Sequence, residues 1–407
     1  MIMRKALKLM PLMLMVLLLT ACDKGKSGSV SEATAFAFMD EDEKWGLMDA
    51  EGNVIVEPEY DMSPTVVQNG VFFVRNFEDH VFELYAVGDK PKLIGKYKDV
   101  GGFAGELCPV VNKKGVLEYI DNTGEARITL KKIKGKEVTS GYDFFDGCAL
   151  VVAGEKYGFI NSNGDVIVPC KYSDGWSFSD GLAILYDSDG YEDENGKWSV
   201  VDTEGNVLFT KKFKDMKPSS FSYKEGLLPV KLSNDRLALI DREGNIVKKL
   251  KAISLSSEII DGKFVFYDED EEKYGLMTTE GEVLLRAKYE TLNYNGKFLV
   301  GSLNDEDYYK LSFEGEKLFK FDGYPYLFGT EVKGYDKAIL VSVGDGYILV
   351  DGEGNEVETQ ASSFNSYDVT WYWSCNTDFE LNGGNDGDED FDGDPEEYYE
   401  EEADSIY

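Results

Sequence analysis

Short apolar runs alternate along this chain with polar turns, and the same arrangement returns again and again. Asp49-Ala-Glu-Gly52 shows it well, with Trp-Gly-Leu-Met before the turn and Val-Ile-Val after it. Aspartate at the first turn position and glycine at the fourth are typical of a type I turn closed by a left-handed glycine, a common hairpin connection. Each copy is therefore predicted to form a β-hairpin.

The turn glycine recurs nine times, at intervals of 34 to 41 residues. A period of this length indicates a stacked or radial repeat architecture. Eight copies begin the turn with Asp, Asn, Ser or Thr, whose side chain can accept from the backbone N–H two residues on. The ninth copy is degraded. The glycines are Gly52, Gly88 (the degraded copy), Gly124, Gly164, Gly205, Gly244, Gly281, Gly315 and Gly354.

Two further features recur around the hairpin. Six copies carry an aromatic residue seven positions before the turn glycine. In three of them a second glycine directly follows the aromatic residue, as in Trp45-Gly46. This pairing predicts a large ring laid across a neighbouring backbone where no Cβ intrudes. A third apolar run follows a Phe-x-x-Gly sequence such as Phe178-Ser-Asp-Gly181. Each unit thus offers three strands, and its apolar face must be covered by neighbouring units.

These residues resemble the bacterial WG-repeat family. The best segment is Lys156-Tyr-Gly-Phe-Ile-Asn-Ser-Asn-Gly164-Asp-Val-Ile-Val-Pro169, followed by residues 44–60. The resemblance covers roughly residues 36–359, and the copies near Gly88, Gly124 and Gly315 depart from it. It implies an architecture but no single activity, because the family is described by its repeat.

The predicted fold is all-β, with nine three-stranded units in a propeller-like ring; an open superhelical β-repeat array is the alternative. Closure removes exposed edges and favours the ring, whereas nine units exceed the usual four to eight blades. The chain starts with a lone strand, Ala33–Met39, and ends with a hairpin, Tyr347–Thr359, that lacks a third strand. The N-terminal strand is therefore predicted to complete the last unit and close the ring.

The first residues carry a targeting signal. Arg4, Lys5 and Lys8 precede an apolar run that ends in Leu-Thr-Ala-Cys22, and the run is too short to span a membrane. The ending resembles the lipobox of bacterial lipoproteins, which implies that Cys22 is acylated. We therefore expect a signal peptide over residues 1–21, a lipidated linker over 22–32 and a lipid-anchored membrane protein of the bacterial cell envelope, in either the inner or the outer membrane.

The charge of the chain excludes some partners. With 42 basic and 77 acidic residues the net charge is −35, which argues against nucleic acid. Twelve of the acids lie in residues 383–407, which hold no lysine or arginine. Such a segment cannot bury enough apolar surface to offset its ordering entropy. The predicted boundaries are a repeat domain over 33–377 and a disordered acidic tail over 378–407.

Groups for catalysis are scarce. His80 is the only histidine, which excludes His-rich zinc sites, and it is predicted to be an exposed loop residue. The recurring acids already have structural explanations in the turns, so no catalytic residue is predicted. Cys108, Cys148, Cys170 and Cys375 have apolar neighbours and are predicted to be free thiols.

Two segments outside the repeats are candidate ligand sites. Asp388, Asp390 and Asp392 fill early positions of a calcium loop, although Tyr399 stands where the bidentate glutamate belongs. Trp371, Tyr372 and Trp373 lie out of phase with the repeat and are candidate binding aromatics.

Three functions fit these observations. The favoured one is a non-enzymatic, lipid-anchored scaffold that binds a protein or glycan partner and needs no cofactor. The alternatives are a carbohydrate-active hydrolase with a carboxylate pair and a calcium-responsive surface protein.

Overall fold

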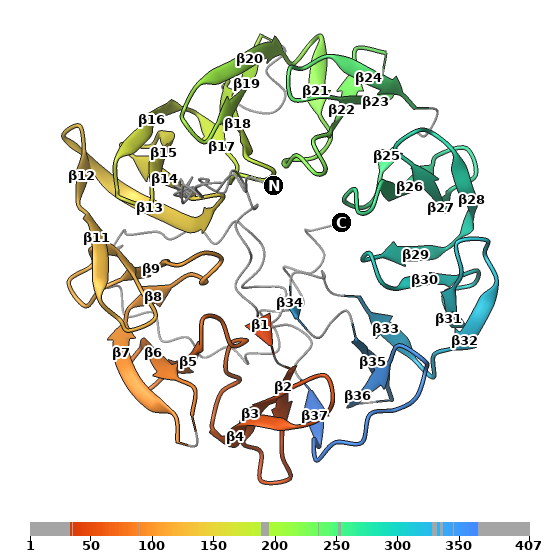
Figure 1. Cartoon of the computed structure of the whole chain (residues 1–407), viewed down its shortest axis with the longest axis horizontal. Coiled ribbons are helices and arrows are strands. Elements are labelled where there is room, and N and C mark those ends of the chain that lie inside the picture. The colour runs from red at the N-terminus through yellow and green to blue at the C-terminus, as the bar shows by residue number, and fades with distance from the viewer. Residues whose placement is uncertain are drawn as a thin grey trace, which may run out of the picture.

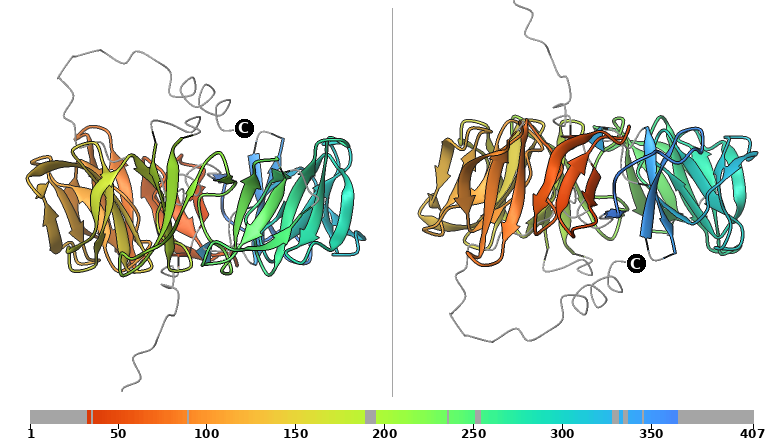
Figure 2. Two further views of the ribbon diagram at one scale, coloured as in Figure 1. Left: turned by 90° about the horizontal axis from the view of Figure 1, so that it is seen from above. Right: turned by 90° about the horizontal axis from the view of Figure 1, so that it is seen from below.

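The computed structural model describes residues 33–364, apart from residues 35, 89, 189–194, 235, 251–253, 328–331, 334–336 and 345. Every regular element in this part of the chain is a β-strand, and no helix in it is long and apolar enough to cross a membrane. The strands form nine antiparallel sheets around one centre (Figure 1), and the ring is a flat disc when seen from its edge (Figure 2). The prediction of an all-β, propeller-like ring of nine units is confirmed.

The blades follow one another in chain order, and each sheet runs from the centre to the rim (Figure 1). Blade 1 holds β37 (Ser363–Phe364), β2 (Phe36–Met39), β3 (Trp45–Met48) and β4 (Val54–Tyr60). Blade 2 holds β5 (Val71–Asn76), β6 (Val81–Ala86) and β7 (Lys92–Tyr97). Blade 3 holds β8 (Asp99–Val100), β9 (Cys108–Val111), β10 (Leu117–Ile120) and β11 (Ala126–Leu130).

The next three blades form the opposite side of the ring. Blade 4 holds β12 (Lys132–Ile133), β13 (Lys136–Phe145), β14 (Cys148–Ala153), β15 (Tyr157–Asn161) and β16 (Val166–Tyr172). Blade 5 holds β17 (Asp174–Gly175), β18 (Leu182–Asp187), β19 (Lys197–Asp202) and β20 (Val207–Lys212). Blade 6 holds β21 (Met216–Pro218), β22 (Leu228–Leu232), β23 (Leu237–Ile240) and β24 (Ile246–Lys249).

The last three blades return the chain to blade 1. Blade 7 holds β25 (Ser254–Leu255), β26 (Lys263–Asp268), β27 (Lys273–Thr278) and β28 (Val283–Tyr289). Blade 8 holds β29 (Thr291–Tyr294), β30 (Leu299–Ser302), β31 (Tyr308–Leu311) and β32 (Lys317–Lys320). Blade 9 holds β33 (Tyr324–Tyr326), β35 (Ala338–Val343) and β36 (Gly346–Asp351), while β1 (Ala33–Thr34) pairs in parallel with β34 (Val332–Lys333).

Most blades hold one strand more than the predicted three. Blades 1, 3, 5, 6, 7 and 8 have four-stranded sheets, because a strand of two to four residues lies beside the other three on the side nearest the centre. A strand of two to four residues is too short to show a clear hydrophobic period. This innermost strand therefore left no trace in the sequence pattern.

The ring closes in blade 1, but not in the predicted way. Strand β2 pairs with β3, the first strand of the hairpin that follows it, and does not complete the last unit. The C-terminal strand β37 pairs with the other edge of β2, with Phe364 opposite Phe38. The predicted unit was shifted by one strand, because the third apolar run belongs to the hairpin after it. Both ends of the propeller thus meet in one sheet.

The predicted hairpin turns are confirmed in eight copies. Their glycines have φ between 76° and 96°, and each donates its N–H to the carbonyl three residues before, as Gly205 does to Asp202 at 2.9 Å. Gly88 alone among the nine predicted turn glycines does not adopt a left-handed φ. The repeat position therefore demands glycine for its backbone conformation in eight of the nine blades.

The same glycines let neighbouring blades approach one another. A Cβ at Gly205 of blade 5 would lie 2.3 Å from the carbonyl oxygen of Ile167 in the outer strand of blade 4. A Cβ at Gly244 would lie 3.0 Å from the ring of Phe209 in blade 5. At the closure, a Cβ at Gly52 would lie 2.7 Å from the carbonyl of Glu358, which follows the last strand of blade 9. The contact between adjacent blades is thus repeated across the point where the chain ends meet.

The glycine after the aromatic residue has a role that differs from the predicted one. Trp45 pairs with Tyr60 and Leu47 with Val56, so the outer strand carries two extra residues opposite Gly46. A Cβ on Gly46 would lie 2.5 Å from the carbonyl oxygen of Val56. The neighbouring backbone itself, rather than an aromatic ring, occupies the space left by the missing Cβ. Gly158 faces the same irregularity in blade 4. Gly275 faces it in blade 7, but there the Phe266 ring is as close as the backbone: a Cβ would lie 2.5 Å from the ring and 2.7 Å from the Leu285 carbonyl oxygen.

The hydrophobic core lies between the blades, as the repeat pattern predicts. One cluster joins residues of blade 5 to residues of blade 6 around Trp198, whose side chain is fully buried. The Trp198 indole Nε1 donates to the carbonyl of Met216 in the next blade at 2.8 Å. Another cluster joins blade 9 to blade 1 and includes Leu340 and Phe364. Each blade is therefore stabilised mainly by its neighbours.

Candidate binding surface

Several predicted site residues lie outside the described residues. This holds for the lipidation site, for the three candidate calcium ligands, for the three candidate binding aromatics and for one of the thiols. They are Cys22, Asp388, Asp390, Asp392, Trp371, Tyr372, Trp373 and Cys375. These assignments, and the boundary of the acidic tail, remain predictions.

His80 lies in the turn between β5 and β6, where it is exposed and has a φ of 52°. The prediction of an exposed loop residue is confirmed. The ion pairs near this turn involve its neighbours: Lys96 pairs with Asp79 at 2.8 Å and with Glu83 at 2.6 Å. The Tyr85 hydroxyl also donates to Glu83 at 2.5 Å. These contacts join the outer strand β7 to the rest of blade 2.

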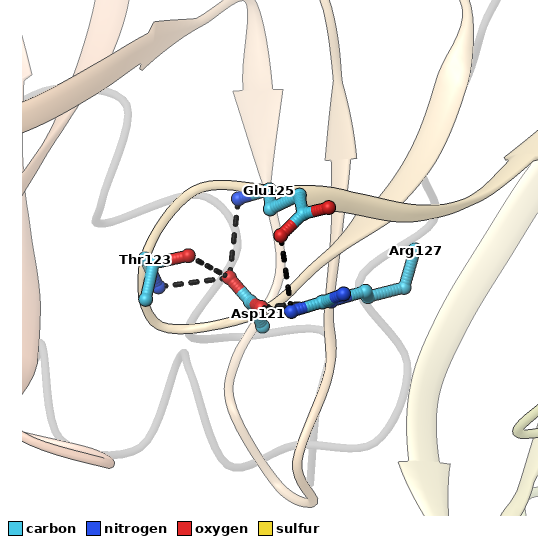
Figure 3. Close-up of polar contacts among 4 residues, drawn as sticks. All are labelled: Asp121, Thr123, Glu125 and Arg127. Atoms are coloured by element: carbon cyan, nitrogen blue, oxygen red, sulfur yellow. Dashed lines mark hydrogen bonds and ion pairs between the residues drawn. The ribbon is translucent and has the colours of Figure 1, made fainter.

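The recurring turn acids act on the backbone. Figure 3 shows Asp121, which accepts from the backbone N–H of Thr123 at 2.9 Å and of Glu125 at 3.1 Å. The Arg127 side chain pairs with the same carboxylate at 2.6 Å. Seven of the eight polar turn residues accept from the N–H two positions on, as predicted. They are Asp49, Asp121, Asn161, Asp202, Asp241, Ser312 and Asp351.

The Asp121 turn makes stability depend on pH. Burial alone would raise the Asp121 pKa, but hydrogen bonds from Thr123 and Arg127 outweigh it and lower the pKa from 3.8 to about 2. A pKa depressed by folding stabilises the native state above pH 3.8, and this contribution is lost as the pH falls toward 2.

We expect Asp121→Ala to melt at a lower temperature than the wild type at pH 7. The gap, which is the difference between the two melting temperatures, should narrow as the pH is lowered. A gap that stayed constant in melting curves down to pH 2 would exclude this account.

A second set of acidic side chains links successive blades, and the sequence did not reveal it as such. The Asp146 carboxylate of blade 4 accepts from the N–H of Gly181 in blade 5 at 2.7 Å. Asp180 of blade 5 accepts in turn from Gly226 in blade 6 at 2.9 Å. Glu225 of blade 6 continues the series to blade 7, accepting from Gly262 at 2.8 Å. The available signal was the acid before glycine in the Phe-x-Asp-Gly sequences.

The three described thiols are structural. Cys108 and Cys148 are buried and Cys170 is half-buried, and all three are free, as predicted. Burial raises the pKa of the Cys148 thiol to about 12, which leaves almost no reactive thiolate at neutral pH.

Basic residues gather on the outermost strands, although acids dominate the chain as a whole. The outermost strands β7, β11, β16, β20, β24, β28 and β32 hold twelve lysines and arginines and no aspartate or glutamate. These residues are Lys92, Lys96, Arg127, Lys171, Lys211, Lys212, Lys248, Lys249, Arg286, Lys288, Lys317 and Lys320. The rim of blades 2–8 therefore has a charge opposite to that of the protein, whereas the outer strand β4 of blade 1 holds the exposed Glu57 and Glu59.

Four consecutive blades combine this charge with exposed apolar side chains. We call the outermost strands β20, β24, β28 and β32 of blades 5–8 the rim arc. Six large apolar side chains on the arc are between 41 and 54% exposed: Val207, Leu208, Ile246, Val247, Val283 and Leu318. On β16 of blade 4 the corresponding Val166 and Ile167 are half-buried. The four arc strands lie on successive blades of the ring (Figure 1), so the arc is an apolar and basic band.

Three basic residues of the arc are available to a ligand. Lys212, Lys249 and Arg286 are exposed, and within the described residues none of the three forms a salt bridge. Each arc strand is also the last strand of its sheet, so one of its edges faces solvent in the described part of the chain. Lysine on an edge strand prevents unwanted strand pairing. That role explains the lysines but not the six exposed apolar side chains, which are typical of a binding surface.

Comparison with known protein families identifies the repeat in part of the chain. The profile of the WG containing repeat family matches residues 45–76, 157–185 and 198–234. These segments include Trp45-Gly46, Tyr157-Gly158 and Trp198, the aromatic positions described above. A comparison with curated proteins gave no match.

Solved structures match the fold across most of the chain. A eukaryotic initiation factor matches with a TM-score of 0.51 and 12% identity, covering 80% of this chain and 95% of its own. BamB from Moraxella catarrhalis gives a TM-score of 0.39 and 12% identity, covering 73% of this chain and 92% of its own. At such low identities the likeness concerns the fold alone.

Proposed function

We propose that this protein is a non-enzymatic scaffold, anchored to the membrane of the cell envelope through Cys22, which binds a protein partner along the rim arc. The carrying observation is the arc itself: exposed apolar side chains and solvent-facing strand edges coincide on four neighbouring blades, and blades 5–7 each add an exposed base that forms no salt bridge in the described residues. The acids that recur in the repeat are engaged in turns and blade contacts, which supports a scaffold rather than a hydrolase.

The chemistry of the arc selects the partner. An extended peptide can add a strand to an exposed sheet edge, where main-chain hydrogen bonds give affinity and side chains give specificity. The exposed lysines and arginine favour acidic side chains on that peptide, and the apolar residues favour aromatic or aliphatic ones. A protein segment that alternates acidic and apolar residues meets all three conditions.

A peptide-binding measurement with rim variants tests this proposal. The probe is a synthetic peptide that alternates glutamate with valine and tyrosine. We expect Lys212→Glu, Lys249→Glu and Arg286→Glu together to weaken its binding by at least about tenfold, since three attractive charges become repulsive. The matched control places the same charge change on blades 2–4, with Lys92→Glu, Lys131→Glu and Lys171→Glu, which are exposed lysines outside the arc. Equal weakening by both triple variants, or binding only to a glycan array, would contradict the proposed site.

The anchor requires a separate test. We expect Cys22→Ser to remain an unprocessed precursor or to become soluble, because the thiol is the atom that would be acylated. Membrane fractionation of cells that express the variant measures this. If Cys22→Ser still sediments with membranes after its signal peptide is cleaved, lipid anchoring through Cys22 is wrong.

A further inference from the structure

We infer that the rim arc is occupied in this protein by its own acidic segment, residues 383–407. The inference rests on the proposed function of the arc, and it names a segment of the same chain as the occupant. The segment lies outside the described residues, so the case depends on its sequence, its length and the surface described above.

Charge directs the segment to the rim. It carries twelve acidic residues and no basic one, whereas the arc strands carry eight basic residues and no acidic one. Acidic loops and turns at the two faces of the ring repel it. Exposed acids fill the loop Glu269–Glu272 between β26 and β27, and acids such as Glu204 and Glu243 stand in the turns at the opposite ends of the strands. The rim arc is therefore a part of the described surface that attracts this segment.

The apolar side chains of the segment also suit the apolar surface of the arc. The segment contains Phe391, Tyr398, Tyr399, Ile406 and Tyr407 among its acids. The arc exposes aliphatic side chains over a width of four blades. Aromatic rings bury a large area on such a surface, and tyrosine can keep its hydroxyl in water. Acids interspersed with aromatic and aliphatic residues are the composition that the arc selects.

The chain is long enough to reach the arc. Strand β37 ends at Phe364 in blade 1, which packs against blade 9, and blade 9 packs in turn against blade 8. The 18 residues between Phe364 and Gly383 span up to about 60 Å when extended, and packed sheets lie roughly 10 Å apart. The near end of the arc, β32 of blade 8, is therefore within reach. A tethered segment also acts at an effective concentration of the order of millimolar, so weak contacts suffice.

Photo-crosslinking in the full chain tests the inference. A photoreactive amino acid replaces Val247, an exposed residue of the arc, and in a second variant it replaces Leu93, an equally apolar and exposed residue of β7. Leu93 lies in blade 2, beside the blade from which the segment departs. Proximity alone would therefore favour crosslinks from Leu93. We expect crosslinks to residues 383–407 from Val247 and not from Leu93, as mapped by mass spectrometry.

The crosslinking results show whether residues 383–407 occupy the arc. Loss of the Val247 crosslink in the Lys212→Glu, Lys249→Glu, Arg286→Glu background, but not in the blade 2–4 control, supports the charge argument. Equal crosslinking from Leu93 and Val247, or crosslinks only between two molecules, overturns the inference. If the synthetic glutamate-rich peptide binds the arc while no crosslink to residues 383–407 forms, the proposed function stands and only the identity of the occupant is wrong.

Discussion

Replacing Gly205 with alanine should lower the free energy of unfolding by about 3 kcal/mol, an unusually large effect for the addition of one methyl group. Two effects, backbone strain and a steric clash, lower the free energy of unfolding at this position. The φ of +84° is unfavourable for any residue with a Cβ, and the new Cβ would lie 2.3 Å from the Ile167 carbonyl oxygen of the preceding blade. Because that atom belongs to the backbone of a paired strand, it cannot move aside without disturbing blade 4. Chemical denaturation of the purified protein measures the loss.

A matched glycine separates the two costs. Gly115 has a φ of +73°, and a Cβ there would meet no atom within 4 Å. Gly115→Ala should therefore cost only the conformational strain, about 1 kcal/mol. If Gly205→Ala and Gly115→Ala destabilise the protein equally, the close approach of blades 4 and 5 contributes nothing and the turn conformation alone explains the repeated glycine.

Ending the chain after Gln360 should open the ring. This truncation removes β37, with the buried Phe364 and the hydrogen bonds from Ser362 to the Met39 carbonyl. Loss of a buried phenylalanine alone costs about 3–5 kcal/mol, and blade 1 also loses its innermost strand. We expect a markedly lower melting temperature and rapid cleavage by proteases within blade 1.

The control for this truncation ends after Asn382 and keeps β37. Its melting temperature should stay within a few degrees of that of the full chain, because the acidic segment makes only weak contacts on the rim and is predicted to contribute nothing to the folded core. The single substitution Phe364→Ala should reproduce much of the loss without shortening the chain. Equal stability of the two truncated proteins would show that β37 does not hold the ring closed.

The sequence was sufficient to predict the units and their turns. Turn geometry depends on local chemistry, so Asp202 at the first position and Gly205 at the fourth predicted both the backbone conformation and its hydrogen bonds. The count of nine units followed from the spacing of these turns, and the closed ring followed from the argument that closure removes exposed edges. Local signals also predicted free thiols and an exposed His80.

Other features depend on contacts between distant segments and were not visible in the sequence. The pairing of Phe38 with Phe364 is one such contact, and its prediction failed because the pattern does not state which hairpin a third strand joins. The bond from Gly181 to Asp146 is another, since the acid before glycine looked like part of a local turn. The rim arc emerged only when the outer strands of four separate repeats were placed side by side.

The repetition of the blade contact at Gly52 and Glu358 has a consequence for how the molecule unfolds. An open solenoid has end units with one neighbour, which fray first and require special capping sequences. In this propeller every blade has two neighbours, so no unit is terminal and none provides a site where fraying starts. Amide hydrogen exchange should therefore report similar protection in blade 1, which holds both chain ends, and in blade 5 on the far side of the ring.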